Sequence, residues 1–170
     1  LAMLKQPNGS DFQFTGNYHE IGKISTYWLY TYKNGVTYYD WDWLNTSSPI
    51  EPGVGYTQKG TGLADEQQYI FEGKPNNGTI LVPVVDAGGN GSVPAISKTD
   101  YLLGNPYPSA LDIHKFIDDN VGVISGTIQL WQQWSGNSHL LDEYNGGYAE
   151  VNKLGSVRAY QFVGLEGETN

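Results

Sequence analysis

The segment "ISTYWLYTYKNGVTYYDWDW" at positions 24–43 decides the fold class. Its two ends, 24–32 and 36–43, are dense in β-branched and aromatic residues, which favour strands. Between them stands Asn34-Gly35, a dipeptide in which both positions tolerate positive φ and which is typical of two-residue hairpin turns. The pattern therefore predicts an antiparallel hairpin whose strands are 24–32 and 36–43.

Short strands and turns are also predicted along the rest of the chain. Each further strand has a β-branched or aromatic centre and is bounded by Gly, Pro or Asn. The predicted ranges are 54–60, 67–73, 78–85, 100–108, 126–134, 144–151 and 156–165. We therefore expect a mainly β fold, an antiparallel β-sandwich of jelly-roll character.

One short α-helix is predicted over 109–120, "SALDIHKFIDDN". Ser109 is a good N-cap, and Asn120 is able to close the C-terminal end. Between them an apolar stripe at helical spacing is formed by Leu111, Ile113, Phe116 and Ile117.

Composition and charge exclude several classes of partner. The net charge is −9 and only nine residues are Lys or Arg, so nucleic acid and anionic membranes are not expected to bind. No Cys is present, which excludes disulfides and thiolate sites. No apolar run approaches the ~20 residues of a membrane span. A neutral ligand or a divalent cation suits such an acidic surface.

Four segments resemble one family of modules and occur in that family's order. They are "IEPGVGYTQKG" (50–60), "YIFEGKPNNGTILVPV" (69–84), "YLLGNPYPSALDIHKFI" (101–117) and "QLWQQWSGNSHLLDEYNGGYAEVN" (129–152). They resemble the "GKPNNG" and "GNPYPSAID" signature of β-rich modules in large surface proteins of bacteria with type IX secretion. The family has a second P-G-x-G-F strand where this chain has "SVRAYQFVGLEGETN" (156–170).

The resemblance implies an extracellular or cell-surface module set among other domains of a parent chain, and it implies no catalytic residues. The opening "LAMLKQ", without an initiating Met, also reads as a piece of a longer protein. We expect residues 1–170 to form one monomeric module, and two Trp-bearing strands about ninety residues apart suggest half-repeats over about 18–85 and 100–165.

The aromatic residues of "TYYDWDW" (37–43) are the main functional candidates. Alternation in a strand places Tyr39, Trp41 and Trp43 on one face, with Asp40 and Asp42 on the other. Such a face serves either as core or as a platform on which the apolar face of a sugar ring stacks, with ~1–3 kcal/mol per ring by analogy with base stacking.

A second set of candidates lies in "IQLWQQWSGN" (128–137). Trp131 and Trp134 have an odd spacing, which predicts that they face opposite sides of their strand, one buried and one exposed. Beside them, Gln133 and Asn137 offer amides that hydrogen-bond sugar hydroxyls.

Catalytic and metal sites are the alternative uses of the acidic residues. On one strand face Asp40 and Asp42 would lie about 7 Å apart, a spacing found in inverting glycosidases. Hard oxygen ligands for calcium are offered by two pairs, Asp118 with Asp119 and Asp86 with Asn90.

We therefore expect a non-catalytic module that binds a neutral polysaccharide or surface glycan for adhesion or for anchoring an attached enzyme, and that needs no cofactor unless calcium. The main alternative is a structural spacer or adhesin segment whose aromatic residues are all core. A glycoside hydrolase using Asp40 and Asp42 is the third.

Overall fold

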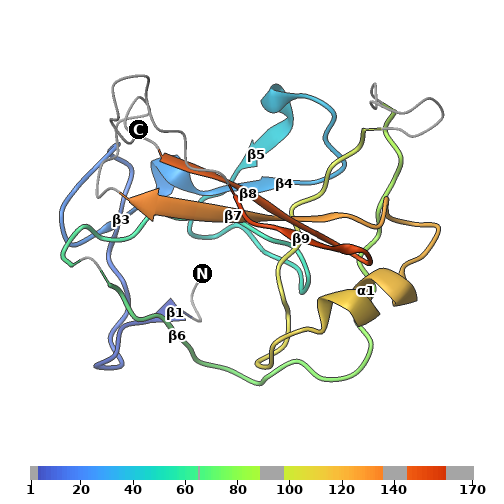
Figure 1. Cartoon of the computed structure of the whole chain (residues 1–170). Helices are drawn as coiled ribbons and strands as arrows, with labels where there is room; N and C mark the ends of the chain where they lie inside the picture. The colour runs from blue at the N-terminus through green and yellow to red at the C-terminus, as the bar shows by residue number, and fades with distance from the viewer. Residues whose placement is uncertain (1–3, 65, 89–97, 136–144, 160–170) are drawn as a thin grey trace. The chain divides into compact units, whose positions relative to one another are not determined.

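The computed structural model describes residues 4–64, 66–88, 98–135 and 145–159 (Figure 1). The chain divides into two compact units, unit 1 (Leu1–Ala110) and unit 2 (Leu111–Asn170). The described part is mainly β with one short α-helix, as predicted, but its strands form small separate sheets and no closed sandwich. The single module with two half-repeats stays a prediction.

The described residues of unit 1 form three two-stranded sheets and two 3₁₀ helices. β1 pairs with β6 and β4 with β5, both antiparallel, while β2 and β3 are parallel. The elements are β1 (Leu4–Lys5), β2 (Phe14–Thr15), β3 (Ile24–Ser25), η1 (Thr26–Trp28), β4 (Tyr30–Tyr32), η2 (Tyr38–Asp40), β5 (Trp41–Trp43) and β6 (Ile70–Phe71).

A small hydrophobic core joins the β1–β6 sheet to the β2–β3 sheet. Leu4, Phe12 and Ile24 are buried, and Phe14 and Tyr69 pack against them. The rings of Phe12 and Tyr69 lie 5.3 Å apart in a tilted arrangement. Burying large apolar side chains contributes about 1.5–3 kcal/mol each, so this cluster holds the N-terminal segment against β6.

The predicted hairpin exists, but it is shorter than expected. β4 and β5 pair in the register Tyr30↔Trp43, Thr31↔Asp42 and Tyr32↔Trp41. A two-residue turn at Asn34-Gly35 would instead have paired 33 with 36. Asn34 does have positive φ (52°), but the backbone of Gly35 pairs with Asp100. The prediction of continuous strands over 24–32 and 36–43 was wrong because η1 and η2 interrupt them.

The other strands predicted in unit 1 are also reduced. Of 67–73 only β6 is a strand, and no strand is present among the described residues of 54–60, 78–85 and 100–108. What remains is a bridge between Val54 and Leu103, with the N–H of Gly55 donating to the carbonyl oxygen of Leu102 at 2.8 Å.

The "GNPYP" segment forms a corner fixed to the loop after β6. The hydroxyl of Tyr107 donates to the carbonyl oxygen of Gly78 (2.7 Å), and the amide of Asn76 donates to that of Pro106 (2.8 Å). Within the corner, the N–H of Tyr107 donates to the side-chain oxygen of Asn105 (3.0 Å). Side-chain bonds to the backbone thus connect two of the segments that the sequence analysis singled out.

Unit 2 contains the helix and one three-stranded antiparallel sheet. Its elements are α1 (Ile113–Asp119), β7 (Ile128–Ser135), β8 (Asn145–Asn152) and β9 (Gly155–Val157), with β8 in the centre of the sheet. β7 and β8 confirm the strands predicted at 126–134 and 144–151. Of the strand predicted at 156–165, β9 covers the first residues, and everything from 160 onward lies outside the described residues.

The helix begins later than predicted. The N-cap of α1 is Asp112, whose carboxylate accepts the N–H of Lys115 (3.0 Å), and the predicted cap Ser109 lies outside the helix. Asn120 is the C-cap, as expected. Ile117 is buried, while Leu111 precedes the helix and is exposed, so the apolar stripe is shorter than the one predicted.

Candidate functional site

Four aromatic rings share one face of the β4–β5 pair. Directly opposed residues of an antiparallel pair project to the same side, so Tyr30 and Trp43 lie together, and Tyr32 and Trp41 beside them. Asp42 projects to the other side, opposite Thr31. The alternation of Trp41, Asp42 and Trp43 is thus present as the sequence predicts.

The two tryptophans of this face have different environments. Trp41 is half-buried, and its ring lies 4.9 Å from that of Tyr32. Trp43 is 53% exposed, and its indole N–H donates to the carbonyl oxygen of Thr26 at 2.8 Å. Trp41 therefore packs against Tyr32 and is partly covered, whereas Trp43 is a ring held at the surface with its only side-chain donor satisfied.

Tyr39 and Asp40 do not lie on the strand, contrary to the prediction, because both belong to η2. The ring of Tyr39 is exposed and meets that of Tyr38 edge-on at 5.8 Å. The carboxylate of Asp40 accepts the backbone N–H groups of Val36 and Thr37, each at 2.7 Å. These two bonds lower the pKa of Asp40.

This arrangement differs from the continuous strand that the catalytic alternative assumed. The spacing of about 7 Å between Asp40 and Asp42 assumed a continuous strand, whereas Asp40 caps a 3₁₀ turn. Asp40 thus has a structural role in unit 1.

A cluster of three rings in unit 1 was not predicted. Tyr18, Tyr27 and Trp28 are in mutual contact, with ring centroids 4.8–5.1 Å apart. The ammonium group of Lys59 lies 3.9 Å from the centroid of the Trp28 ring. Ser25 caps η1 by accepting the N–H of Tyr27 (3.2 Å). The Ser-Thr pair at 25–26 was the available signal that the alternation breaks there.

In unit 2 one face of the sheet carries a tryptophan whose indole packs over a glycine. Trp131 and Tyr148 are directly opposed on β7 and β8, with rings 5.0 Å apart and inclined at 72°. A Cβ atom built on Gly146 would lie 2.3 Å from Cζ2 of Trp131, so the indole occupies the space above this glycine. Trp131 nevertheless remains 43% exposed.

Polar groups flank these rings on the same face. Gln129 and Glu150 are opposed two positions along the ladder from Trp131 and Tyr148, and the Gln129 amide donates to the Glu150 carboxylate at 3.2 Å. We call this surface the indole platform, and it consists of Gln129, Trp131, Gly146, Tyr148 and Glu150. It pairs a flat apolar ring with hydrogen-bonding groups beside it.

The remaining predicted residues of this region are only partly placed. Gln133 opposes Gly146 in the ladder, and the register shifts between Gln133 and Ser135, which places an irregularity at Trp134. Bulges change the direction of side chains. The prediction that Trp131 and Trp134 face opposite sides of the strand assumed regular alternation, which does not hold across this irregularity. The side chains of Gln133 and Trp134, and all of Asn137, lie outside the described residues.

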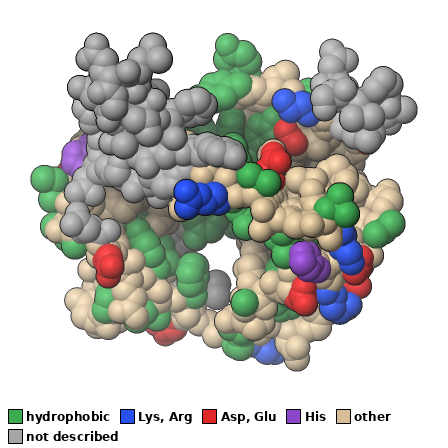
Figure 2. Space-filling view, viewed as in Figure 1, with side chains coloured by type: hydrophobic (Ala, Val, Ile, Leu, Met, Phe, Trp, Pro, Cys, Tyr) green, Lys and Arg blue, Asp and Glu red, His purple; other side chains and the backbone are tan. Residues whose placement is uncertain are grey.

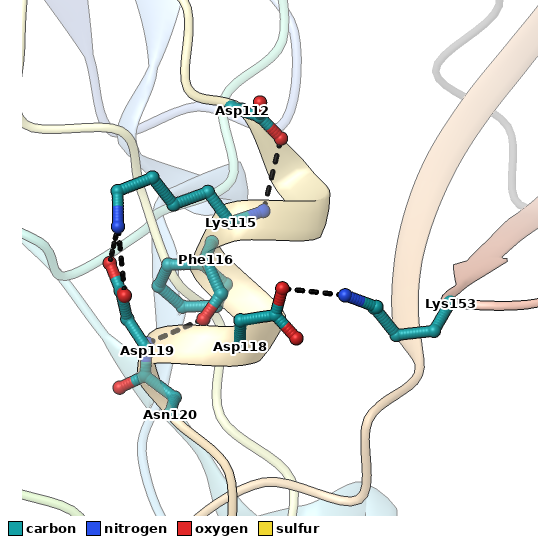
Figure 3. A network of polar contacts seen from close by, with 7 residues as sticks. All are labelled: Asp112, Lys115, Phe116, Asp118, Asp119, Asn120 and Lys153. Carbon is teal, nitrogen blue, oxygen red and sulfur yellow. Dashed lines mark hydrogen bonds and ion pairs between the residues drawn. The ribbon is translucent and has the colours of Figure 1, made fainter.

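The acidic residues considered for calcium have protein partners. Asp119 pairs with Lys115 through both oxygens (2.9 Å each), and Asp118 pairs with Lys153 (2.5 Å), as Figure 3 shows. Charged side chains gather over α1 in Figure 2. Asp86 accepts the N–H of Gly88 (2.8 Å).

Its predicted partner Asn90 lies outside the described residues. Within the described ranges no group of three or more His, Cys, Asp or Glu residues is placed to hold a metal ion.

A shallow groove in unit 1 is mainly apolar. It has a volume of ≈ 310 Å³, and its walls include Tyr56, Phe71 and Leu103. Among the described residues that line it, Glu51 is the only one with a charged side chain.

Comparison with known proteins assigns the chain to a family. No helix in the described part of the chain has the length and apolar character that crossing a bilayer requires. Neither the curated proteins nor the solved structures contain a match to the chain. Residues 14–169 match the family described as Domain of unknown function (DUF8693), and the chain belongs to that family.

Proposed function

We propose that this chain is a non-catalytic module that binds carbohydrate through exposed aromatic rings, and that the indole platform is its main binding surface. The observation that supports this most is the position of Trp131. Its indole lies over Gly146 and against Tyr148, so the ring is fixed, yet almost half of it is exposed. A rigid exposed ring loses little conformational entropy on binding.

The platform fits the chemistry of a sugar ring. The C–H face of a pyranose stacks on an indole, and by analogy with base stacking each such contact contributes ~1–3 kcal/mol, roughly 5- to 150-fold in affinity. The Gln129 amide and the Glu150 carboxylate lie on the same face and are able to hydrogen-bond hydroxyl groups. One surface thus supplies both stacking and orientation.

The charge of the chain favours a neutral polysaccharide. Glu150 places a carboxylate at the platform itself, and the net charge is −9. Sulfated or uronate polymers would be repelled by this field, whereas a neutral chain is not affected by it. Adhesion to a surface glycan, or anchoring of an attached enzyme to its substrate, are the uses that we propose.

The proposal includes the cellular context and the finer fold. The resemblance to modules of type IX-secreted proteins supports an extracellular or cell-surface location, within a parent chain with other domains. The pattern of short strands and turns in the sequence supports a jelly-roll sandwich, and the small antiparallel sheets are compatible with that architecture.

Affinity electrophoresis and isothermal titration calorimetry test the proposal. The probes are hydroxyethyl cellulose, xylan, galactomannan and laminarin, with polygalacturonate and heparin as anionic controls. We expect the wild type to be retarded by a neutral polymer and Trp131→Ala to lose at least fivefold in affinity, while Trp131→Phe keeps part of it.

The matched control is Leu130→Ala. Leu130 is 48% exposed, next to Trp131 in sequence, and lies on the opposite face of the sheet. Its removal should leave binding unchanged. If no polymer retards the wild type, or if Trp131→Ala binds as the wild type does, the proposal is wrong and a structural spacer becomes the better description.

A further inference from the structure

We infer that unit 1 carries a second, independent saccharide-stacking site, formed by Trp43 and Tyr27, so that one chain binds two sugar segments. This inference rests on the proposed function, because it assigns the same ligand class, a neutral saccharide, to a different surface. We call this surface the Trp43 site.

Trp43 is held in place at the surface of unit 1 by one side-chain hydrogen bond and by its position in the β4–β5 ladder. Its indole N–H donates to the carbonyl oxygen of Thr26, and on β4 it is directly opposed by Tyr30. The hydrogen bond fixes the ring at its edge and satisfies its only donor. A ligand would therefore meet the ring through its face, which is the geometry that sugar stacking requires.

Tyr27 provides a second exposed ring beside this bond. It is 48% exposed, and its ring contacts those of Trp28 (5.1 Å) and Tyr18 (5.0 Å). The peptide group between Thr26 and Tyr27 contains the carbonyl oxygen that accepts the indole N–H of Trp43. The two exposed rings are thus joined through one peptide group, and each is immobilised by neighbours instead of by burial.

The loop that follows β5 carries polar groups a few residues after Trp43 in the sequence. Asn45 accepts the N–H (2.8 Å) and the hydroxyl (2.6 Å) of Ser47 through its side-chain oxygen. The amide is oriented by these bonds, and Asn45 and Ser47 are both exposed. Amides and hydroxyls of this kind are the usual hydrogen-bonding partners of sugar hydroxyls.

Two sites on one chain have a measurable consequence. A polymer offers many equivalent segments, so that the second binding event becomes intramolecular whenever both sites reach the same chain or surface. A short oligosaccharide offers one segment and reports each site separately. Stoichiometry with a short ligand therefore distinguishes two sites from one.

Calorimetric titration with cellohexaose, xylohexaose and mannohexaose tests the inference on the whole chain. We expect two ligands per wild-type chain, one for Trp43→Ala, one for Trp131→Ala, and none for the double variant. Trp43→Phe keeps a ring but not the N–H, and should retain two. Tyr27→Ala should reduce the stoichiometry to one if Trp43→Ala fails to fold.

Tyr38→Ala is the control, because Tyr38 is exposed on η2, close in sequence, and outside the Trp43 site. It should retain two ligands. A single ligand on the wild type that is lost in Trp131→Ala would overturn the second site and leave the proposed function intact. No ligand on the wild type would overturn both, and a loss of one ligand in Tyr38→Ala would show that the site is misassigned.

Discussion

Replacing Gly146 by alanine should damage the indole platform, and the structure gives the reason. An added Cβ would lie 2.3 Å from Cζ2 and 2.9 Å from Cε2 of Trp131, and 2.9 Å from the carbonyl oxygen of Gln132. Carbon atoms in contact are normally ≈ 3.5–4.0 Å apart, so the indole or strand β8 must move.

The expected cost comes from two opposing effects. Overpacking of this kind typically costs about 1–3 kcal/mol. Losing a glycine also restricts the unfolded chain, which stabilises by about 0.4–1 kcal/mol where the backbone allows alanine. Gly146 is not among the residues with positive φ, so backbone strain adds nothing. The clash is the larger effect, and a chain of this size loses about 2–4 °C in Tm per kcal/mol.

Urea denaturation of Gly146→Ala, alone and combined with Trp131→Ala, measures this effect. Once the indole is removed, the two contacts of the added methyl group with Trp131 are gone and the 2.9 Å contact with the Gln132 carbonyl oxygen remains, so the cost should fall without vanishing. Gly16→Ala is the control, because a Cβ there meets nothing within 4 Å. An equal cost of Gly146→Ala with and without the indole would refute the claim that Trp131 rests on this glycine.

Three further predictions concern the acidic residues. The pKa of Asp40 is lowered by backbone N–H donors, so its contribution to stability is present above the unfolded pKa of about 3.9 and is lost as pH falls through the lower folded value. In thermal melts at a series of acidic pH values, Asp40→Asn should therefore show a smaller fall of Tm with decreasing pH than the wild type. Asp112→Ala should accelerate amide hydrogen exchange in the first turn of α1, whereas Asp112→Asn should largely preserve protection; equal rates in both would contradict the capping role. Chelation with EDTA should leave Tm unchanged because Asp118 and Asp119 are paired with lysines, and a calcium-dependent rise in Tm would show that the ion pairs give way to a metal.

The hairpin shows how far a β pattern predicts structure. Composition predicted the pairing of β4 with β5, and Asn34 adopts the expected positive φ. The prediction of a two-residue turn was wrong because Thr37 and Asp40 form a capping box. This box stabilises a 3₁₀ turn where the predicted strand would have continued the ladder. Short polar side chains that bond the nearby backbone compete with a sheet, and strand propensity does not register this competition.

The helix start shows a similar competition between local signals. Ser109 and Asp112 are both good caps. The carbonyl oxygen of Ser109 accepts the Asn105 amide at 2.7 Å, which ties this residue to the "GNPYP" corner. Asp112 is the next capping residue along the chain, and the helix starts after it. The contact with Asn105 was not visible in a pattern search centred on the helix.

The indole platform was only half predictable. Trp131 and the two strands were expected, but Gly146 and Tyr148 come to lie beside Trp131 through the register of β7 and β8. The strands are joined by the segment 136–144, which is longer than the two-residue turns whose sequence fixes the register. Without the register, the sequence identified the ring but not the surface around it.

Glycine and aromatic content are connected in this chain. In unit 2 the Trp131 indole occupies the space above Gly146, and in unit 1 a Cβ on Gly35 would lie 2.2 Å from Cζ of Tyr32. Each ring thus packs against bare backbone, where any other residue would place a side chain. A ring can be held in this way on a sheet that has no deep core beneath it. Tyr32 is buried and Trp131 is half-exposed, so the same packing arrangement holds a core ring in one unit and a surface ring in the other.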